Sequence, residues 1–151
     1  MKLAEALLIR GDLQNKIYEM RTRLSNNALV QEGEETAENP EELLNQTEEL
    51  LKNLQELIAK INLTNATVNN GGKTITEILA ERDCLKQNIS IYRDFLSEAS
   101  MTAKRARGSE IKVLSSVSVA ELQKQIDKKS QNLRKLELEI QQLNWTNDLI
   151  D

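Results

Sequence analysis

Apolar residues recur along this chain in alternating steps of three and four, which is the spacing of one face of an α-helix. The first such run predicts a helix over about residues 2–28. A second begins at Asn39-Pro40, where a capping residue precedes a proline at the first helical position, and ends at the Asn-Asn-Gly-Gly stretch of residues 69–72. Both runs are typical of long amphipathic helices that bury a broad apolar face.

Two further runs follow in the second half of the chain. Thr74 with Glu77, and Ser118 with Glu121, have the spacing of capping boxes, so we expect the third and fourth helices to start there, with a break near Gly108 between them. The predicted fold class is therefore all-α, an up-down-up-down bundle of four long helices.

A short two-stranded β ribbon is predicted at one end of this bundle. Residues 110–117 are rich in β-branched side chains and lack helical spacing, and residues 28–31 follow the first helix. In an up-and-down bundle these two connections lie at the same end, so we expect them to pair.

The second half of the sequence repeats the first. Adding 72 to the numbers of the first helix places Leu3 on Ile75, and it matches polar residues as well, Glu5 with Glu77 and Arg10 with Arg82. The second and fourth helices agree at an offset of 79, for example in Leu54 with Leu133. The pattern predicts a duplicated helical hairpin within a single helical-bundle domain, residues 1–151, with pseudo-repeat halves 1–70 and 73–151.

The composition excludes several kinds of active site and metal site. The chain has 151 residues, no histidine and one cysteine, Cys84. Without histidine there is no Ser-His or Cys-His nucleophile system and no ordinary zinc site, and neither GxGxxG nor a Walker-type phosphate loop occurs. We therefore expect a protein that is not an enzyme and that has neither a metal nor a cofactor.

The N-terminal residues do not form a targeting segment. Glu5 and Arg10 interrupt the first apolar run, so it lacks a signal-peptide core, and no apolar stretch approaches the roughly 18 residues that span a bilayer. A lone cysteine fits a reducing compartment. We expect a cytoplasmic protein without a membrane partner.

One polar pattern is repeated near the ends of the second and fourth helices. INLTN (61–65) and LNWTN (143–147) both place Asn-x-Thr-Asn after an apolar residue. In antiparallel hairpins these ends lie beside the first turns of the other two helices, so we expect both motifs to converge on Arg10 and Arg82, which occupy seam positions and need acceptors. The candidate binding residues are Arg10, Arg82, Asn62, Thr64, Asn65, Asn144, Thr146, Asn147, Glu5, Glu77, Asp12 and Asp83.

This cluster has two interpretations. It can be a satisfied polar layer that fixes helix register, as a buried Asn does in coiled coils. Alternatively it is a pocket in which two arginines bind a small anion, because the guanidinium fork suits phosphate and carboxylate.

Charge is divided unevenly along the chain. Residues 30–56 contain nine Glu and one Lys, whereas residues 102–135 contain nine Lys or Arg and three acids. We expect these segments to neutralise each other within or between protomers. The dense basic stretch Lys104-Arg105-Ala106-Arg107 can also meet nucleic acid, but the adjacent acidic loop and the net charge of −4 argue against a nucleic-acid partner.

Four stretches, LAEALLIRGDLQNKI, VQEGEETAENPEELL, GSEIKVLSSVSVAEL and NWTNDL, together resemble a family of small, uncharacterised helical bacterial proteins labelled septicolysin-like. The resemblance covers almost the whole chain and supplies no catalytic residues. Its label implies a membrane-active, cytolysin-like toxin, although the chain has no apolar hairpin.

The function that the sequence favours is a non-enzymatic helical assembly or interaction protein that forms a homo-oligomer. A small-anion binding module based on Arg10 and Arg82 is the alternative. The toxin implied by the family label is a third hypothesis, in which amphipathic helices refold on lipid.

Overall fold

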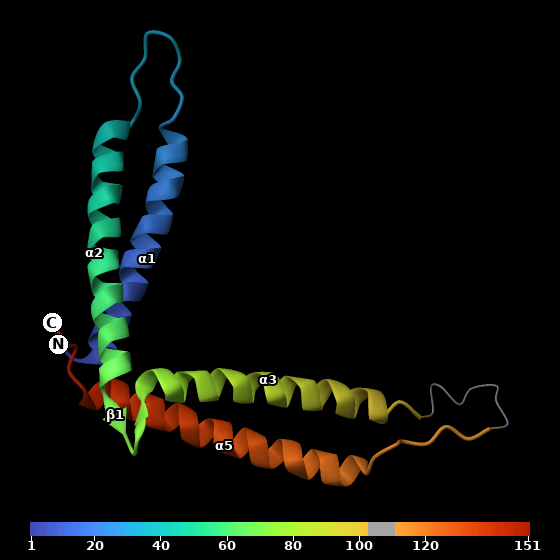
Figure 1. Ribbon diagram of the computed structural model, residues 1–151. Coiled ribbons are helices and arrows are strands. Elements are labelled where there is room, and N and C mark those ends of the chain that lie inside the picture. The colour runs from blue at the N-terminus through green and yellow to red at the C-terminus, as the bar shows by residue number, and fades with distance from the viewer. Residues whose placement is uncertain (103–110) are drawn as a thin grey trace. The chain divides into compact units, whose positions relative to one another are not determined.

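The computed structural model describes residues 1–102 and 111–151, and it is built from helices (Figure 1). In these residues four long helices occur, α1 (Leu3–Asn26), α2 (Pro40–Thr67), α3 (Ile75–Ala99) and α5 (Val119–Thr146). A two-stranded antiparallel ribbon, β1 (Asn69–Asn70) and β2 (Lys73–Thr74), lies between α2 and α3. The structure confirms the all-α fold class with its short ribbon.

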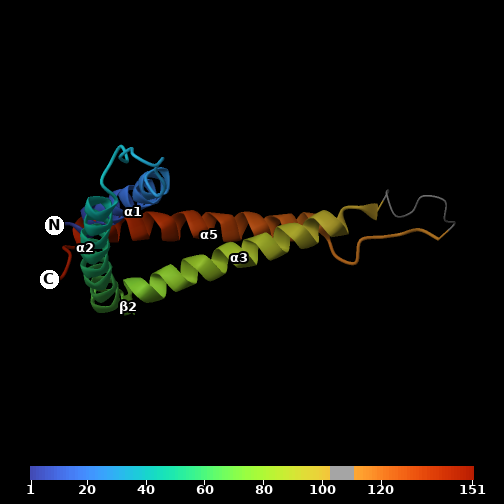
Figure 2. The same cartoon turned by 90° about the horizontal axis from the view of Figure 1, so that it is seen from above.

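The chain divides into two compact units. The first contains Met1–Asn70 together with Leu143–Asp151, and the second contains Gly71–Gln142. In the first unit α1 and α2 lie side by side and antiparallel, and in the second α3 and α5 do the same (Figures 1 and 2). Each unit is thus a helical hairpin. None of the described helices is long and apolar enough to cross a membrane.

The helix starts follow local capping chemistry. The Asn39 side chain accepts a hydrogen bond from the Glu41 backbone N–H at 2.9 Å, and Pro40 occupies the first turn of α2. At the start of α3, Glu77 accepts the Thr74 backbone N–H at 2.7 Å. Glu5 accepts the Lys2 backbone N–H at the same distance. Glu5 and Glu77, which align in the sequence repeat, therefore both cap the start of a helix, α1 and α3 respectively.

The ribbon is not where the sequence pattern placed it. Residues 28–31 and 111–117 form no strand, and the dipeptides around Gly71 and Gly72 pair instead. Both glycines have positive φ, 60° and 88°, which is the backbone twist that a two-residue hairpin turn needs. The Gly-Gly pair therefore makes the tight turn of the ribbon, whereas α2 has already ended at Thr67.

The register of the repeat extends through the second helix of each hairpin. Both α2 and α5 have 28 residues, so an offset of 79 holds from their first residue to their last. Leu43 and Leu122 are buried at equivalent positions near the N-terminal ends of α2 and α5, which we call the outer ends of the hairpins. Ile61 and Ile140 are buried near the C-terminal ends of these helices, which we call the inner ends. The same positions therefore form the core in both units.

Candidate functional site

The two seam arginines, Arg10 and Arg82, are half-buried. Arg82 pairs with its neighbour Asp83, with 2.9 Å between Nε and Oδ1. A long arginine stem can lie along the apolar seam while its guanidinium reaches solvent, which removes the need for buried acceptors. Arg10 belongs to the first unit and Arg82 to the second, and their convergence stays a prediction.

The first Asn-x-Thr-Asn motif holds the C-terminal segment. Thr64 is 0% exposed, and its Oγ1 donates to the Lys60 carbonyl at 2.8 Å and accepts the Ile150 backbone N–H at 2.9 Å. Asn62 is exposed and Asn65 is half-buried. In this motif the buried polar residue is the threonine, and its role is structural.

The second motif is displaced by three residues from the structural repeat. The offset of 79 places Leu143, not Thr146, at the position of Thr64, and Thr146 is exposed while Asn144 is buried. Asn147 donates from Nδ2 to the Leu143 carbonyl at 2.9 Å and caps the end of the helix. The two motifs therefore occupy different positions in the structural repeat, and a shift of three residues turns the side chains to another part of the helix surface.

Segments near the two ends of the chain meet beside Asn147. Its backbone carbonyl accepts the Leu3 N–H at 3.0 Å, and the Leu149 N–H donates to the Met1 carbonyl at 2.8 Å. Lys2 forms an ion pair with Asp148 at 3.0 Å, which lowers the pKa of that carboxyl. The last residues thus complete the inner end of the first unit.

The acidic members of the predicted site also have mainly local roles. Glu5 and Glu77 belong to the helix starts, where the Thr74 backbone N–H holds the pKa of Glu77 below its ordinary value. Asp83 is the partner of Arg82, and Asp12 is exposed. These contacts stabilise helices.

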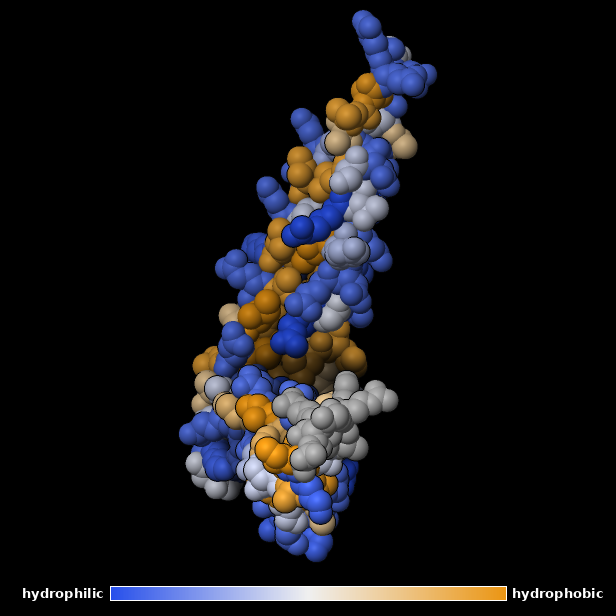
Figure 3. Space-filling view, turned by 90° about the vertical axis from the view of Figure 1, so that its right-hand side faces the viewer, coloured by the Kyte–Doolittle hydropathy of each residue, from blue (hydrophilic) through white to orange (hydrophobic). Residues whose placement is uncertain are grey.

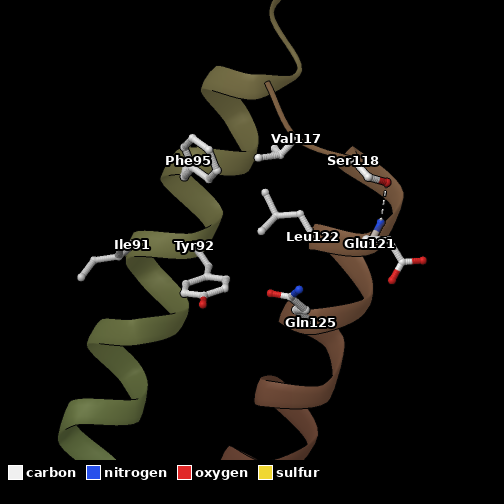
Figure 4. Close-up of a pocket in the computed structure, with 8 residues that line it drawn as sticks. All are labelled: Ile91, Tyr92, Phe95, Val117, Ser118, Glu121, Leu122 and Gln125. Atoms are coloured by element: carbon white, nitrogen blue, oxygen red, sulfur yellow. Dashed lines mark hydrogen bonds between the residues drawn. The ribbon is translucent and has the colours of Figure 1, made fainter. Parts of the chain in front are cut away.

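The sequence did not predict an open apolar pocket of about 460 Å³ between α3 and α5 (Figure 4). Tyr92 and Phe95 from α3 face Val117 and Leu122 at the start of α5. Ser118 caps this helix by accepting the Glu121 N–H at 3.3 Å. The lining residues are Ile91, Tyr92, Phe95, Val117, Ser118, Glu121, Leu122 and Gln125.

The equivalent place in the first hairpin is closed. There the offsets put Arg23 where the second hairpin has Phe95, and Glu38 where it has Val117. Arg23 and Glu38 form an ion pair, with 3.1 Å between Nε and Oε2. Beneath them Met20 is 3% exposed, whereas its equivalent Tyr92 is half-buried at the edge of the pocket, and Leu43 and its equivalent Leu122 are both buried, at 2% and 8%.

The lining of this pocket is mainly apolar. The Ser118 hydroxyl is engaged in capping, and the Tyr92 ring lies under Lys129, whose Nζ is 4.6 Å from the ring centroid. The lining offers apolar surface with an amide and a carboxylate at the rim, and no nucleophile beside a base. Within residues 1–102 and 111–151 no group of three potential metal ligands occurs.

A second pocket, of about 420 Å³, lies elsewhere between α3 and α5. Arg82 lines it together with Arg134, and Glu137 and Leu138 also contribute. Glu137 is paired with Lys86 at 3.6 Å. The structure thus places Arg82 beside an arginine that the sequence analysis did not select.

Comparison with protein families matches residues 10–149 to a model described as "Family of unknown function (DUF6847)". The chain belongs to this family. The DUF6847 chain is similar to a solved structure described as the crystal structure of a functionally unknown conserved protein from Corynebacterium diphtheriae. The two chains share 35% identity over 99% of each, with a TM-score of 0.89. No curated protein matches the DUF6847 chain.

Proposed function

We propose that this protein is a non-enzymatic helical assembly protein that associates with further copies of itself. The observation that carries the proposal is the apolar surface that the hairpins leave uncovered. Two helices packed together can cover only one side of each broad apolar face, so the remainder requires a partner.

This surface is most evident on α2. Leu44 and Leu51 are 51% and 47% exposed, and Ile58 is half-buried. Residues seven apart share one face of a helix, so the three form a stripe, which we call the α2 stripe. Figure 3 shows hydrophobic residues gathered in a band along the α1/α2 hairpin. Exposed bands of this kind mark interaction surfaces more often than scattered apolar residues do.

Charge supports self-association as well. The first unit contains seven Lys or Arg and fourteen Asp or Glu, whereas the second contains thirteen and ten. A surface with net negative charge therefore accompanies one with net positive charge in every copy. Such complementarity accelerates association and selects the partner.

Light scattering of the full chain at low and high salt tests the proposal. We expect a dimer or a larger assembly that weakens as salt screens the charges. A monomer at all salt concentrations and at high protein concentration would contradict self-association. If the affinity of the assembly is unchanged in high salt, the interface is apolar and charge does not contribute to it.

Binding of a small anion is a second candidate, because Arg82 and Arg134 line one pocket. A thermal-shift screen of phosphates, nucleotides and carboxylates tests it. A ligand at a hundredfold excess over its dissociation constant adds about 2.7 kcal/mol. Loss of the shift in Arg82→Met would support the site, and a flat screen of the unmodified chain would refute it.

The resemblance to septicolysin-like proteins stays a prediction, and leakage of dye from liposomes is its test. The cytoplasmic location also stays a prediction.

A further inference from the structure

We propose that the pocket between α3 and α5 receives the α2 stripe of a second copy of this chain. The inference rests on the proposed self-association and names the two surfaces that meet. Apolar knobs on one hairpin would enter an apolar hole on the other, as in the packing of helical bundles.

The internal repeat shows that the open pocket is not required by the hairpin fold. In the first hairpin an ion pair, Arg23 with Glu38, closes the same place over Met20 and Leu43. The second hairpin has Phe95 and Val117 at these positions, and they leave an apolar hole. Because apolar surface is stabilised by removal from water, the hole favours an apolar occupant.

The charges beside the two surfaces are complementary. Lys128 and Lys135 follow Glu121, a residue at the pocket rim, at intervals of seven and so lie on the same face of α5. Beside the α2 stripe, Glu41 and Glu48 stand three residues before and four residues after Leu44. Among the described residues, these two lysines and two glutamates form no ion pair.

Charge also argues against contact between two copies of the same helix. At the offset of 79, Glu49 is equivalent to Lys128 and Glu56 to Lys135, so α2 and α5 carry opposite charges at these two positions. Two α2 helices would bring glutamates together, and two α5 helices would bring lysines together. Contact of α2 with α5 avoids both repulsions.

The first test transfers the closing ion pair from one hairpin to the other. Phe95→Arg combined with Val117→Glu should retain the fold, because the same pair closes the first hairpin. We expect self-association, measured by light scattering and analytical ultracentrifugation, to weaken at least about tenfold, since loss of a buried apolar anchor costs more than 1.4 kcal/mol. Tyr18→Arg is the matched control, because Tyr18 is an exposed aromatic residue of α1 outside this pocket. The control should associate as the unmodified chain does.

The second test reverses the charges on each surface separately. One variant carries Glu41→Lys and Glu48→Lys, and the other carries Lys128→Glu and Lys135→Glu. Each variant alone should associate at least about tenfold more weakly, whereas an equimolar mixture should regain association, because the altered α2 of one chain then matches the altered α5 of the other. Circular dichroism and thermal melting establish that each variant is folded.

The outcomes separate the inference from the proposed function. If the unmodified chain is monomeric, self-association itself fails. If it associates but neither the transferred ion pair nor the charge reversals weaken it, self-association stands and the contact between α2 and the pocket is refuted. Failure of the mixture to regain association also refutes this contact.

Discussion

The two hairpins are alike at their helix starts and in their cores, but they differ at their outer ends. Glu5 and Glu77 accept hydrogen bonds at the starts of α1 and α3, and the seams bury the same positions, such as Ile61 and Ile140. At the outer ends, however, an ion pair closes one hairpin and an apolar pocket opens the other. Residues that fix helix starts and core are equivalent in the two halves, whereas residues that decide what the surface can bind are not.

The largest expected effect tests the shared core. Leu3 and Ile75 are fully buried at the first positions of α1 and α3. We expect Leu3→Ala and Ile75→Ala each to lower the free energy of unfolding by about 2–5 kcal/mol, because each leaves a cavity. Urea denaturation measures this. A large effect in one hairpin with almost none in the other would break the equivalence of the two cores.

The next test compares the contributions of Thr64 and Thr146 to stability. In Thr64→Val the Ile150 N–H loses its acceptor inside the protein, which should lower the free energy of unfolding by about 1–3 kcal/mol. Thr146→Val is the matched control, because Thr146 is exposed and its hydroxyl makes long hydrogen bonds, to the Leu143 carbonyl at 3.5 Å and from Asn147 at 3.3 Å, so the change in stability should be smaller than that of Thr64→Val. Equal losses in the two variants would contradict the displacement of the second motif.

Helix caps provide a smaller comparison. Asn39 accepts backbone N–H groups from Glu41 at 2.9 Å and Glu42 at 3.5 Å, whereas Ser118 accepts one from Glu121 at 3.3 Å. Replacement of a cap by Ala costs about 1 kcal/mol. We expect Asn39→Ala to lower the melting temperature more than Ser118→Ala does. The reverse order would show that the geometry of the cap does not determine how much each cap stabilises its helix.

The smallest effect concerns pH. The hydrogen bond from Arg23 holds the pKa of Glu38 below its ordinary value of about 4.5. Because this pKa is depressed on folding, the stabilisation is present above pH 4.5 and is lost as pH falls through the lower folded value. Acidification should therefore lower the protection of the Glu38 N–H against amide exchange, after correction for the intrinsic pH dependence of exchange; this N–H donates to Asn27 at 2.9 Å. Glu38→Gln should remove this pH dependence in nuclear magnetic resonance measurements, and an unchanged profile would exclude the ion pair as its cause.

Helix starts could be predicted because capping is local. Asn39-Pro40, Thr74 and Ser118 each begin the helix that the sequence pattern assigned to them. The third helix ends at Ala99, and the break expected near Gly108 lies outside the described residues. The basic stretch at Lys104, Arg105 and Arg107 lies outside them as well.

The pocket could not be predicted because it depends on residues that fail to match across the repeat. The comparison of Leu24 with Leu96 located the seam, but the informative pair is the preceding one, Arg23 with Phe95. Agreement between repeats identifies the core, and a mismatch beside it identifies a change of surface. The two Asn-x-Thr-Asn motifs illustrate the same point, because their residues match at an offset of 82 while the helices repeat at 79, so matching residues do not occupy equivalent positions.

The hydrogen bond between Thr64 and Ile150 has a consequence for synthesis on the ribosome. The two residues are 86 positions apart, so α1 and α2 emerge long before the segment that completes their inner end. During translation the α1/α2 hairpin therefore forms first without the segment that completes it, and its fold is finished only after Ile150 has left the exit tunnel.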